Sequence, residues 1–468
     1  MKNMTLRRIA EACGGILHGK NGMEDAEVAS VVTDSRQAKE GALFAAIKGE
    51  RVDGHRFIPA VFEQGAVCVL SEQELPEDTA GSWIKVISTL GALKDIAEYY
   101  LRQLNIPVVG ITGSVGKTST KEVVAAVLSQ KYRTLKTQGN FNNELGLPLT
   151  VFRLREEDEM AVLEMGISNF GEMHRLAKIA RPDTCVITNI GQCHLEYLHS
   201  RDGILQAKTE IFDFLRPDGH IILNGNDDKL ILVKNVNGIE PVFFGLKPEK
   251  DGHPEEAPAL SVWADEIKSR GLKGVSCRIH TPDGSISVRI PIPGQHMVYN
   301  ALAAAAVGLT YGLSPEQIRA GIESLQPVSG RFHIIETENY MIIDDCYNAN
   351  PVSMKASLEV LQDGAGRRVA ILGDMGELGE NEALLHEEVG AFAGSCRIDK
   401  LIGVGPLCAG LIRKAGEENS ELELSHYDTP EELLDCLEEQ VQAGDTILVK
   451  ASHFMNFSRI VDALQKMG

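Results

Sequence analysis

The stretch that decides the fold reads Val108-Val109-Gly110-Ile111-Thr112-Gly113-Ser114-Val115-Gly116-Lys117-Thr118-Ser119. An apolar strand leads into a glycine-rich turn and then into a segment with helical spacing up to residue 130, which is typical of a phosphate-binding loop. Glycines let backbone N–H groups converge on phosphate oxygens, and the helix N-terminus adds a favourable dipole. In such a loop Lys117 reaches the β- and γ-phosphates and the Thr118 hydroxyl binds Mg²⁺. The pattern G-x-x-x-x-G-K-[ST] is missed at one position, because Ile111 stands where its first glycine belongs.

Two further apolar stretches supply candidate partners for the metal. Residues 160–163 predict a strand that ends at Glu164, and residues 184–188 predict a strand that leads to His194. Ligands of parallel sheets bind at the carboxyl ends of the strands, and an acid at such an end holds Mg²⁺ in phosphate-loop proteins. We therefore expect Glu164 and His194 near the loop. A solvated glutamate and a structural histidine are the alternatives.

The chain has 468 residues, which at roughly 150 per domain predicts three domains. We place them at residues 1–90, 91–325 and 326–468. Each alternates strands with helices, so the fold class is α/β: a small N-terminal α/β domain, a central P-loop ATPase domain with a parallel sheet, and a C-terminal Rossmann-like domain. The main predicted strands are 28–33, 42–47, 67–70, 107–111, 275–279, 286–290, 341–343, 368–372, 400–404 and 446–449. Predicted helices span 91–104, 118–130, 172–179, 300–311 and 430–442, and residues 247–258 predict an exposed loop.

Composition narrows the functional class. Acidic residues exceed basic ones by 66 − 46 = 20, which argues against a nucleic-acid or polybasic membrane binder but not against a local phosphate site. The nine cysteines lack the spacing of zinc or redox motifs, and the N-terminus resembles an amphipathic helix rather than a signal peptide. No apolar run is long enough to span a bilayer. We expect a cytoplasmic protein without stable membrane insertion.

Several motifs together resemble the Mur ligase family of peptidoglycan synthesis over essentially the whole chain. That family's phosphate loop also lacks the first glycine. The matching segments are residues 112–118, 137–146, 164–166, 189–191, 194–196, 207–211, 344–351 (Asp-Asp-Cys-Tyr-Asn-Ala-Asn-Pro) and 373–379 (Gly-Asp-Met-Gly-Glu-Leu-Gly).

The resemblance implies an ATP-dependent amide ligase. The signatures at 344–351 and 373–379 are similar to those of the member that joins D-alanyl-D-alanine to UDP-N-acetylmuramoyl-tripeptide through an acyl phosphate, releasing ADP and phosphate. Such an enzyme acts in cell-wall biogenesis, and through it in cell shape, cell division and the cell cycle. The three domains would then hold the UDP-sugar peptide, ATP and the dipeptide, in chain order, in a protein that we expect to be a monomer.

The resemblance also assigns candidate residues. Lys117, Glu164, His194 and Lys208 are the implied catalytic residues. The implied ATP contacts are Gly113, Ser114, Val115, Gly116, Lys117, Thr118, Ser119, Asn300, Arg331, Asp345 and Tyr347. Two Mg²⁺ ions are implied, held by Thr118, Thr137, Glu164, His194 and Lys208 as a carbamate (N6-carboxylysine). An unmodified Lys208 that binds phosphate directly is the alternative. The implied UDP-substrate contacts are Ser35, Arg36, Asp53, His55, Asn142 and Asn143, with a structural capping turn as the alternative around Ser35.

Two positions depart from the family pattern. Met297 stands where the family has asparagine, which puts one contact near the adenine in doubt, and His453 replaces an arginine near the C-terminus. Histidine titrates near neutral pH, whereas arginine keeps its charge.

Three other functions stay open. A sibling ligase that adds the third amino acid and a folylpolyglutamate synthase share the central domain. A regulatory ATPase that binds nucleotide without ligation belongs to a different class, and the third α/β domain argues against it.

Overall fold

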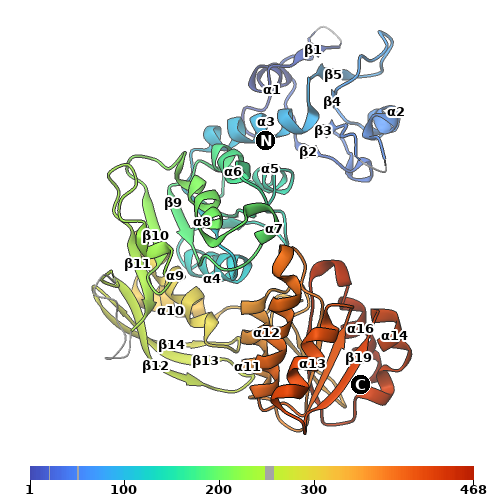
Figure 1. Cartoon of the computed structure of the whole chain (residues 1–468). Helices are drawn as coiled ribbons and strands as arrows, with labels where there is room; N and C mark the ends of the chain where they lie inside the picture. The colour runs from blue at the N-terminus through green and yellow to red at the C-terminus, as the bar shows by residue number, and fades with distance from the viewer. Residues whose placement is uncertain (20–21, 50–51, 248–257) are drawn as a thin grey trace.

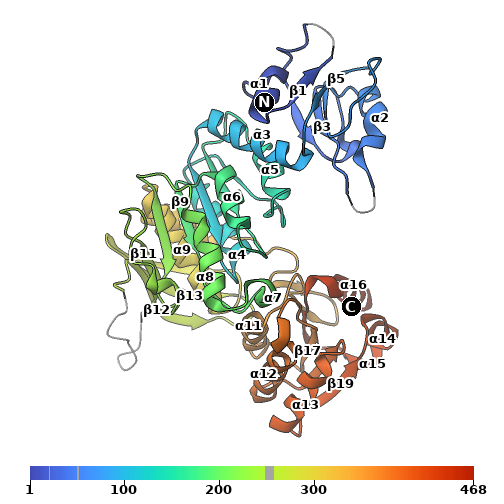
Figure 2. The same ribbon diagram turned by 45° about the horizontal axis from the view of Figure 1, so that its top comes forward.

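The computed structural model describes residues 1–19, 22–49, 52–247 and 258–468, so most of the predicted loop 247–258 lies outside the described residues. Figures 1 and 2 show three α/β units in chain order, each with a sheet of its own. In the described parts of the chain these sheets have five, nine and six strands. The predicted α/β class is confirmed. Across the same residues, no helix combines the length and apolar character needed to cross a bilayer.

The N-terminal sheet has the order β1-β5-β4-β3-β2, with β1 antiparallel and the other strands parallel. The predicted strands 28–33, 42–47 and 67–70 correspond to β2, β3 and β4. Two capping turns follow β2 and β3, at Ser35–Gln37 and Gly54–Phe57. The elements are α1 (Leu6–Ala12), β1 (Ile16–His18), β2 (Ser30–Val32), β3 (Ala42–Ala45), α2 (Ile58–Glu63), β4 (Cys68–Ser71) and β5 (Ser82–Lys85).

Helix α3 (Thr89–Leu104) joins the first unit to the second. Its apolar side, including Leu93 and Ile96, lies in one core with α1 of the N-terminal unit and with α5 and α6 of the central unit. Asn105 ends the helix in a left-handed conformation (φ 49°). The proposed boundaries at residues 90 and 325 fall between the sheets, since β5 ends at Lys85 and β6 begins at Val108, and β14 ends at Ile290 and β15 begins at His333.

The central sheet has the order β14-β13-β12-β11-β10-β9-β6-β8-β7. It is parallel from β7 to β12, and the hairpin β13–β14 extends it antiparallel. Helices α4, α9 and α10 pack on one face, and α3, α5, α6 and α8 on the other. The elements are β6 (Val108–Thr112), α4 (Lys117–Leu128), β7 (Thr134–Lys136), α5 (Gly146–Val151), β8 (Met160–Glu164), α6 (Glu172–Ala180), β9 (Thr184–Ile187), α7 (Leu195–Leu198), α8 (Arg201–Thr209), β10 (His220–Asn224), β11 (Val242–Leu246), β12 (Val262–Ser269), β13 (Val275–Thr281), β14 (Gly284–Ile290), α9 (His296–Thr310) and α10 (Pro315–Glu323).

The C-terminal sheet has the order β15-β16-β20-β17-β18-β19, with only β15 antiparallel among the described strands. The single helix predicted at 430–442 is wrong: Cys436 leaves the helical conformation (φ −128°) and divides it into α14 and α15. The elements are β15 (His333–Glu336), β16 (Met341–Asp344), α11 (Pro351–Leu361), β17 (Arg368–Gly373), α12 (Glu382–Ser395), β18 (Lys400–Val404), α13 (Cys408–Glu418), β19 (Glu423–Tyr427), α14 (Pro430–Asp435), α15 (Leu437–Gln440), β20 (Thr446–Lys450) and α16 (Ser458–Met467).

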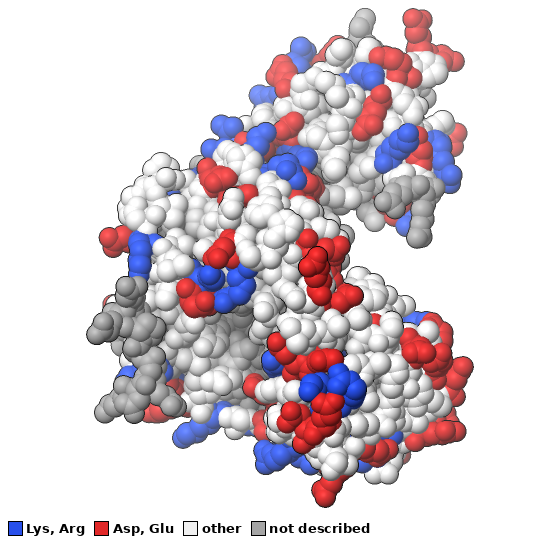
Figure 3. Space-filling view, viewed as in Figure 1, with Lys and Arg blue, Asp and Glu red and all other residues white. Residues whose placement is uncertain are grey.

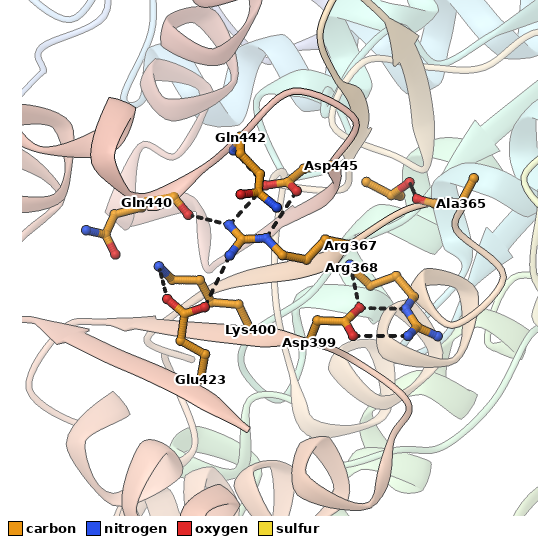
Figure 4. Close-up of polar contacts among 10 residues, drawn as sticks. Ala365, Arg367, Arg368, Asp399, Lys400, Glu423, Gln440, Gln442 and Asp445 are labelled. Carbon is orange, nitrogen blue, oxygen red and sulfur yellow. Dashed lines mark hydrogen bonds and ion pairs between the residues drawn. The ribbon is translucent and has the colours of Figure 1, made fainter. Parts of the chain in front are cut away.

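A polar network ties together the amino ends of these C-terminal strands (Figure 4). The guanidinium of Arg367 donates to the buried carboxylate of Asp445 (3.1 Å), to the carbonyl of Gln440 (3.0 Å) and to Glu423 (3.1 Å). Glu423 also pairs with the buried ammonium of Lys400 at 2.7 Å. Because ligands bind at the opposite, carboxyl edge of a parallel sheet, we interpret this network as structural.

Candidate active site

The phosphate loop sits between β6 and α4, as predicted, and is tied to the end of β9. Gly113 (φ +146°) has no room for a side chain, since a Cβ there would lie 1.9 Å from the hydroxyl of Thr188. Gly116 (φ +83°) begins α4 in a left-handed conformation. The backbone N–H of Val115 donates to the side-chain oxygen of Asn189 (3.0 Å). The N-terminus of α4 faces a cleft that is described below.

The side chain of Lys117 folds back onto the phosphate loop. Its ammonium donates to the carbonyl oxygens of Gly113 (2.8 Å) and Ser114 (3.3 Å). This is a local arrangement that phosphate oxygens can replace, because an anion is a stronger acceptor than a carbonyl. The loop therefore presents one cation and a row of backbone donors to the same space.

Glu164 ends β8 beside the loop, because Ile111 of β6 and Glu164 are partners in the parallel ladder. Its carboxylate is buried, and Oε1 accepts hydrogen bonds from the Thr118 hydroxyl (3.1 Å) and the Asn142 amide (2.8 Å). The hydroxyl of Thr137 accepts the backbone N–H of Glu164 (3.0 Å). The other carboxylate oxygen, Oε2, accepts no hydrogen bond from the residues that the structure describes. Three of the predicted metal ligands are thus brought together.

Lys208 lies in the last turn of α8 with no exposed surface, and its Nζ donates a hydrogen bond to none of the described residues. The pKa of its ammonium is lowered from 10.5 to about 8, chiefly by burial; Cys193 partly opposes the change, and the nearby charge of Lys117 adds to it. A buried lysine without a counter-ion is expensive for a fold, so its presence points to a partner that binds there.

His194 bridges the central and C-terminal units. It has a left-handed backbone (φ 56°), and its Nδ1 lies 2.6 Å from Oε2 of Glu377, a contact at ion-pair distance that lacks the alignment of a hydrogen bond. Contact with His194 lowers the pKa of Glu377. Helix α7 and the turn at Gly379–Asn381 also touch across this boundary. The pairing brings the C-terminal unit against the phosphate loop.

A cleft of about 730 Å³ joins these groups. Among its walls are the phosphate loop, Glu164 and His194 from the central unit, and Arg331, Asp345 and Tyr347 from the C-terminal unit. The guanidinium carbon of Arg331 lies 4.1 Å from the centre of the Tyr347 ring. The centre of the His453 ring lies 5.3 Å from the centre of the same tyrosine ring. The side chains of predicted ATP contacts from two units therefore face one space.

Two of the predicted ATP-binding residues, Asn300 and Asp345, form hydrogen bonds with other residues of the protein. Asn300 is buried below the loop, where it accepts from the Thr120 hydroxyl (3.0 Å) and donates to the sulfur of Met297 (3.2 Å). Met297 is thus the partner of Asn300. The carboxylate of Asp345 accepts from Lys450 (2.6 Å) and from Ser357 (2.8 Å).

The predicted UDP-substrate residues lie in two places. Ser35 and Arg36 follow β2, where Arg36 pairs with Asp34 and, with its backbone N–H, lowers the pKa of that carboxyl to about 2. Asp53 and His55 follow β3, and their side chains meet at 2.6 Å. Asn142 and Asn143 instead line the central cleft, which places Asn142 beside Glu164.

Sequence reasoning missed Lys121, Glu377 and Lys450. Lys121 follows Thr118 by three residues on α4, so helical spacing alone could have placed it beside the metal ligands. Glu377 lies inside the quoted motif 373–379, but its pairing with His194 depends on how two domains meet. Lys450 ends β20 at the same sheet edge as Asp345.

A second cluster of metal-type side chains does not behave as a site. Asp374, His386 and Cys408 are buried with ligand atoms within 4.8 Å of one another. His386 already accepts from the backbone N–H of Met375 and contacts the carbonyl of Glu382, and Asp374 accepts from the N–H of Cys408. These atoms hold the carboxyl ends of β17 and β18 in place.

Comparison with known proteins gives consistent matches along the chain. Three family models match: "Mur ligase family, catalytic domain" at residues 27–115, "Mur ligase middle domain" at 111–308 and "Mur ligase, glutamate ligase domain" at 330–453. A UDP-N-acetylmuramoyl-tripeptide–D-alanyl-D-alanine ligase of Bacillus subtilis is 38% identical over 99% of each chain. A crystal structure of MurF from Acinetobacter baumannii covers 99% of both chains at 33% identity, with a TM-score of 0.87. A MurF ligase of Thermotoga maritima, solved in complex with ADP, covers 93% of this chain and 97% of its own at 29% identity, with a TM-score of 0.80.

Proposed function

The chain belongs to the Mur ligase family, and from this premise we propose that it joins D-alanyl-D-alanine to UDP-N-acetylmuramoyl-tripeptide with ATP as the energy source. The observation that carries the proposal is the full-length similarity to ligases of that name, combined with a cleft in which the phosphate loop faces the C-terminal unit. The implied product is the UDP-N-acetylmuramoyl-pentapeptide precursor of peptidoglycan. We place the protein in the cytoplasm as a monomer, with a part in cell-wall biogenesis, cell shape and division.

The reaction forms an amide in two steps. A carboxylate oxygen of the tripeptide attacks the γ-phosphorus of ATP, the bond to the β-phosphate oxygen breaks, and ADP leaves. The amine of the dipeptide then attacks the acyl carbon, loses a proton and expels phosphate. Because the first step brings two anions together, its transition state needs preorganised positive charge.

The phosphate loop supplies that charge from the protein. Lys117 and the backbone N–H groups at the start of α4 bind the β- and γ-phosphates, and Arg331 reaches the same cleft from the C-terminal unit. A narrow recess between α4 and residues 325–331, with Met297 in its wall, adjoins this cleft, and we propose that the adenine ring packs over its mouth. The ADP complex of the Thermotoga maritima relative supports nucleotide binding in this fold.

The residues present fit a divalent cation. Oε2 of Glu164 and Nζ of Lys208 are buried and have no hydrogen-bond partner in the described part of the chain. Hydroxyl and carboxylate oxygens are the ligand atoms that Mg²⁺ prefers. We propose that Thr118, Thr137 and Glu164 hold one Mg²⁺ ion, and that Glu164, His194 and Lys208 as a carbamate hold a second. When bound, the ions neutralise the charge of the phosphate oxygens.

A second cavity, of about 340 Å³, suits the dipeptide. Lys117 and His194 line it from the central unit, and Glu377, His453 and Phe454 from the C-terminal unit. A carboxylate near the phosphate loop can hold the ammonium group of D-alanyl-D-alanine beside the acyl carbon. We propose that Glu377 does this, while His453 faces the carboxylate end and Phe454 packs against a methyl group.

One assay decides between this function and its rivals. We expect phosphate release from ATP only when UDP-N-acetylmuramoyl-tripeptide and D-alanyl-D-alanine are both present, with a product mass that equals their sum less one water. Turnover with the dipeptide precursor and a free amino acid would favour the sibling ligase. Turnover with a folate and glutamate would favour a folylpolyglutamate synthase.

A further inference from the structure

A buried lysine, Lys121, faces the metal-binding carboxylate and has no part in the reaction described above. Its side chain is 1% exposed, and its Nζ lies 3.7 Å from Oε2 of Glu164 and 3.1 Å from Oε1 of Glu122. Within the described ranges of the chain, neither Lys121 Nζ nor Glu164 Oε2 makes a hydrogen bond. The two charges therefore compensate each other without a fixed contact.

The spacing along α4 explains how Lys121 reaches this carboxylate. Thr118 and Lys121 are three residues apart and share one face of the helix. Thr118 donates to one oxygen of Glu164, and Lys121 faces the other. The Oε2 atom that Lys121 faces is the one left free for a metal ion.

Lys121 also has a second anionic partner. Glu122 pairs with Lys121 on its buried side and with the half-exposed Lys136 on its outer side. A lysine held between two carboxylates can shift its charge from one to the other with little movement. When a cation binds Glu164, repulsion between like charges favours the contact with Glu122.

We propose that Lys121 is a positioning residue of the metal site: it is a counter-cation shared by Glu164 and Glu122 while no metal is bound, and its contact shifts wholly to Glu122 once a divalent cation binds Glu164. The proposal rests on the metal site of the proposed function, although it does not depend on the ligation reaction. Lys121 thereby stabilises the metal-free protein more than the metal-bound one. Removing its charge should consequently tighten metal binding, by linkage.

The test measures Mn²⁺ binding by electron paramagnetic resonance in bicarbonate buffer without nucleotide, together with melting temperatures. We expect Lys121→Met to lower the dissociation constant for Mn²⁺ about tenfold and to lower the metal-free melting temperature by roughly 5–15 °C, because a buried carboxylate loses its partner. Saturating Mn²⁺ should restore at least half of that loss. Lys136→Met is the matched control and should change the dissociation constant less than twofold, since it does not face Glu164.

Glu122→Gln provides the opposite perturbation. It removes the alternative partner of Lys121, so we expect Mn²⁺ to bind at least twofold more weakly. If Lys121→Met does not fold without metal, the binding of Mn²⁺ by Glu122→Gln alone tests the role of Lys121. A dissociation constant of Lys121→Met within twofold of the wild type or weaker, or unchanged binding by Glu122→Gln, overturns the role of Lys121. Failure of the wild type to bind Mn²⁺, with or without ATP, would instead remove the metal site of the proposed function.

Discussion

The state of Lys208 leads to the most specific prediction, because its buried ammonium makes neither a hydrogen bond nor an ion pair with the described residues. Only a neutral amine reacts with dissolved carbon dioxide to give a carbamate. We therefore expect Lys208 to become carbamylated near neutral pH, where an ordinary lysine does not. The perturbation is a change of pH at a fixed concentration of dissolved carbon dioxide.

The lowered pKa of Lys208 sets the size of the effect. With a pKa of about 8, roughly 9% of the amine is neutral at pH 7, whereas a lysine at 10.5 has about 0.03% neutral, a ratio near 300. The neutral fraction grows about tenfold per pH unit below the pKa. Carbamylation of Lys208 should accordingly rise between pH 6 and 8 and reach its plateau roughly 2.5 pH units below that of an exposed lysine.

Nuclear magnetic resonance of the protein in carbon-13-labelled bicarbonate measures the carbamate directly. We expect one carbamate signal at pH 7.5 that is absent from Lys208→Ala and retained in Lys121→Met, a matched control at another buried lysine near the cleft. Short carboxylic acids should partly restore turnover to Lys208→Ala, because they replace the missing anion. A signal that persists in Lys208→Ala, or full activity of an enzyme that carries only the free amine, would refute the reasoning.

Three further predictions concern activity and stability. Lys117→Ala and Glu164→Gln should each lower kcat by at least about 100-fold in the phosphate-release assay, with an unchanged melting temperature for Lys117→Ala; normal turnover would mean that the site is misplaced. Burial lowers the pKa of His296 from 6.5 to about 4, so as the pH falls this histidine is protonated in the unfolded chain before it is protonated in the folded protein. Unfolding titrations should therefore show that about 3 kcal/mol of stability is lost between pH 6.5 and 4. This loss should be absent from His296→Asn. Asp445→Asn should destabilise the protein by about 2–4 kcal/mol in urea unfolding, because the Arg367 guanidinium loses its buried partner, while kcat stays the same for the fraction that is folded.

Local patterns were sufficient to predict the phosphate loop and its surroundings. Strand 107–111, the turn and helix 118–130 appear within two residues of their predicted positions, since apolar periodicity and glycine placement act over short distances. Glu164 was expected at the loop because strand ends of a parallel sheet share an edge. The same rule placed His194 nearby.

Contacts that depend on the meeting of distant elements could not be predicted. Nothing in the sequence around Asn300 shows that its amide is used by Thr120 and Met297 below the loop. The pairing of His194 with Glu377 requires the C-terminal unit to dock, and no local pattern carries that information. The break at Cys436 likewise interrupts a segment whose spacing is helical throughout.

The four buried lysines of the described residues show how an acidic chain can build a site for anions. The net charge of −20 already favours solubility, so solubility does not explain why the chain buries cations. Three of these lysines have a carboxylate within ion-pair distance: Lys121 has Glu122 and Glu164, Lys400 has Glu423, and Lys450 has Asp345.

Lys208 has no such partner among the residues that the structure describes, although a buried charge without a partner destabilises a fold. Two of the three paired lysines, Lys121 and Lys450, hold carboxylates that line the cleft. Of the four buried lysines that the structure describes, Lys208 is thus the one without a carboxylate partner, so folding alone does not account for it. A reaction that needs an anion at this position, formed from the lysine itself, would account for it.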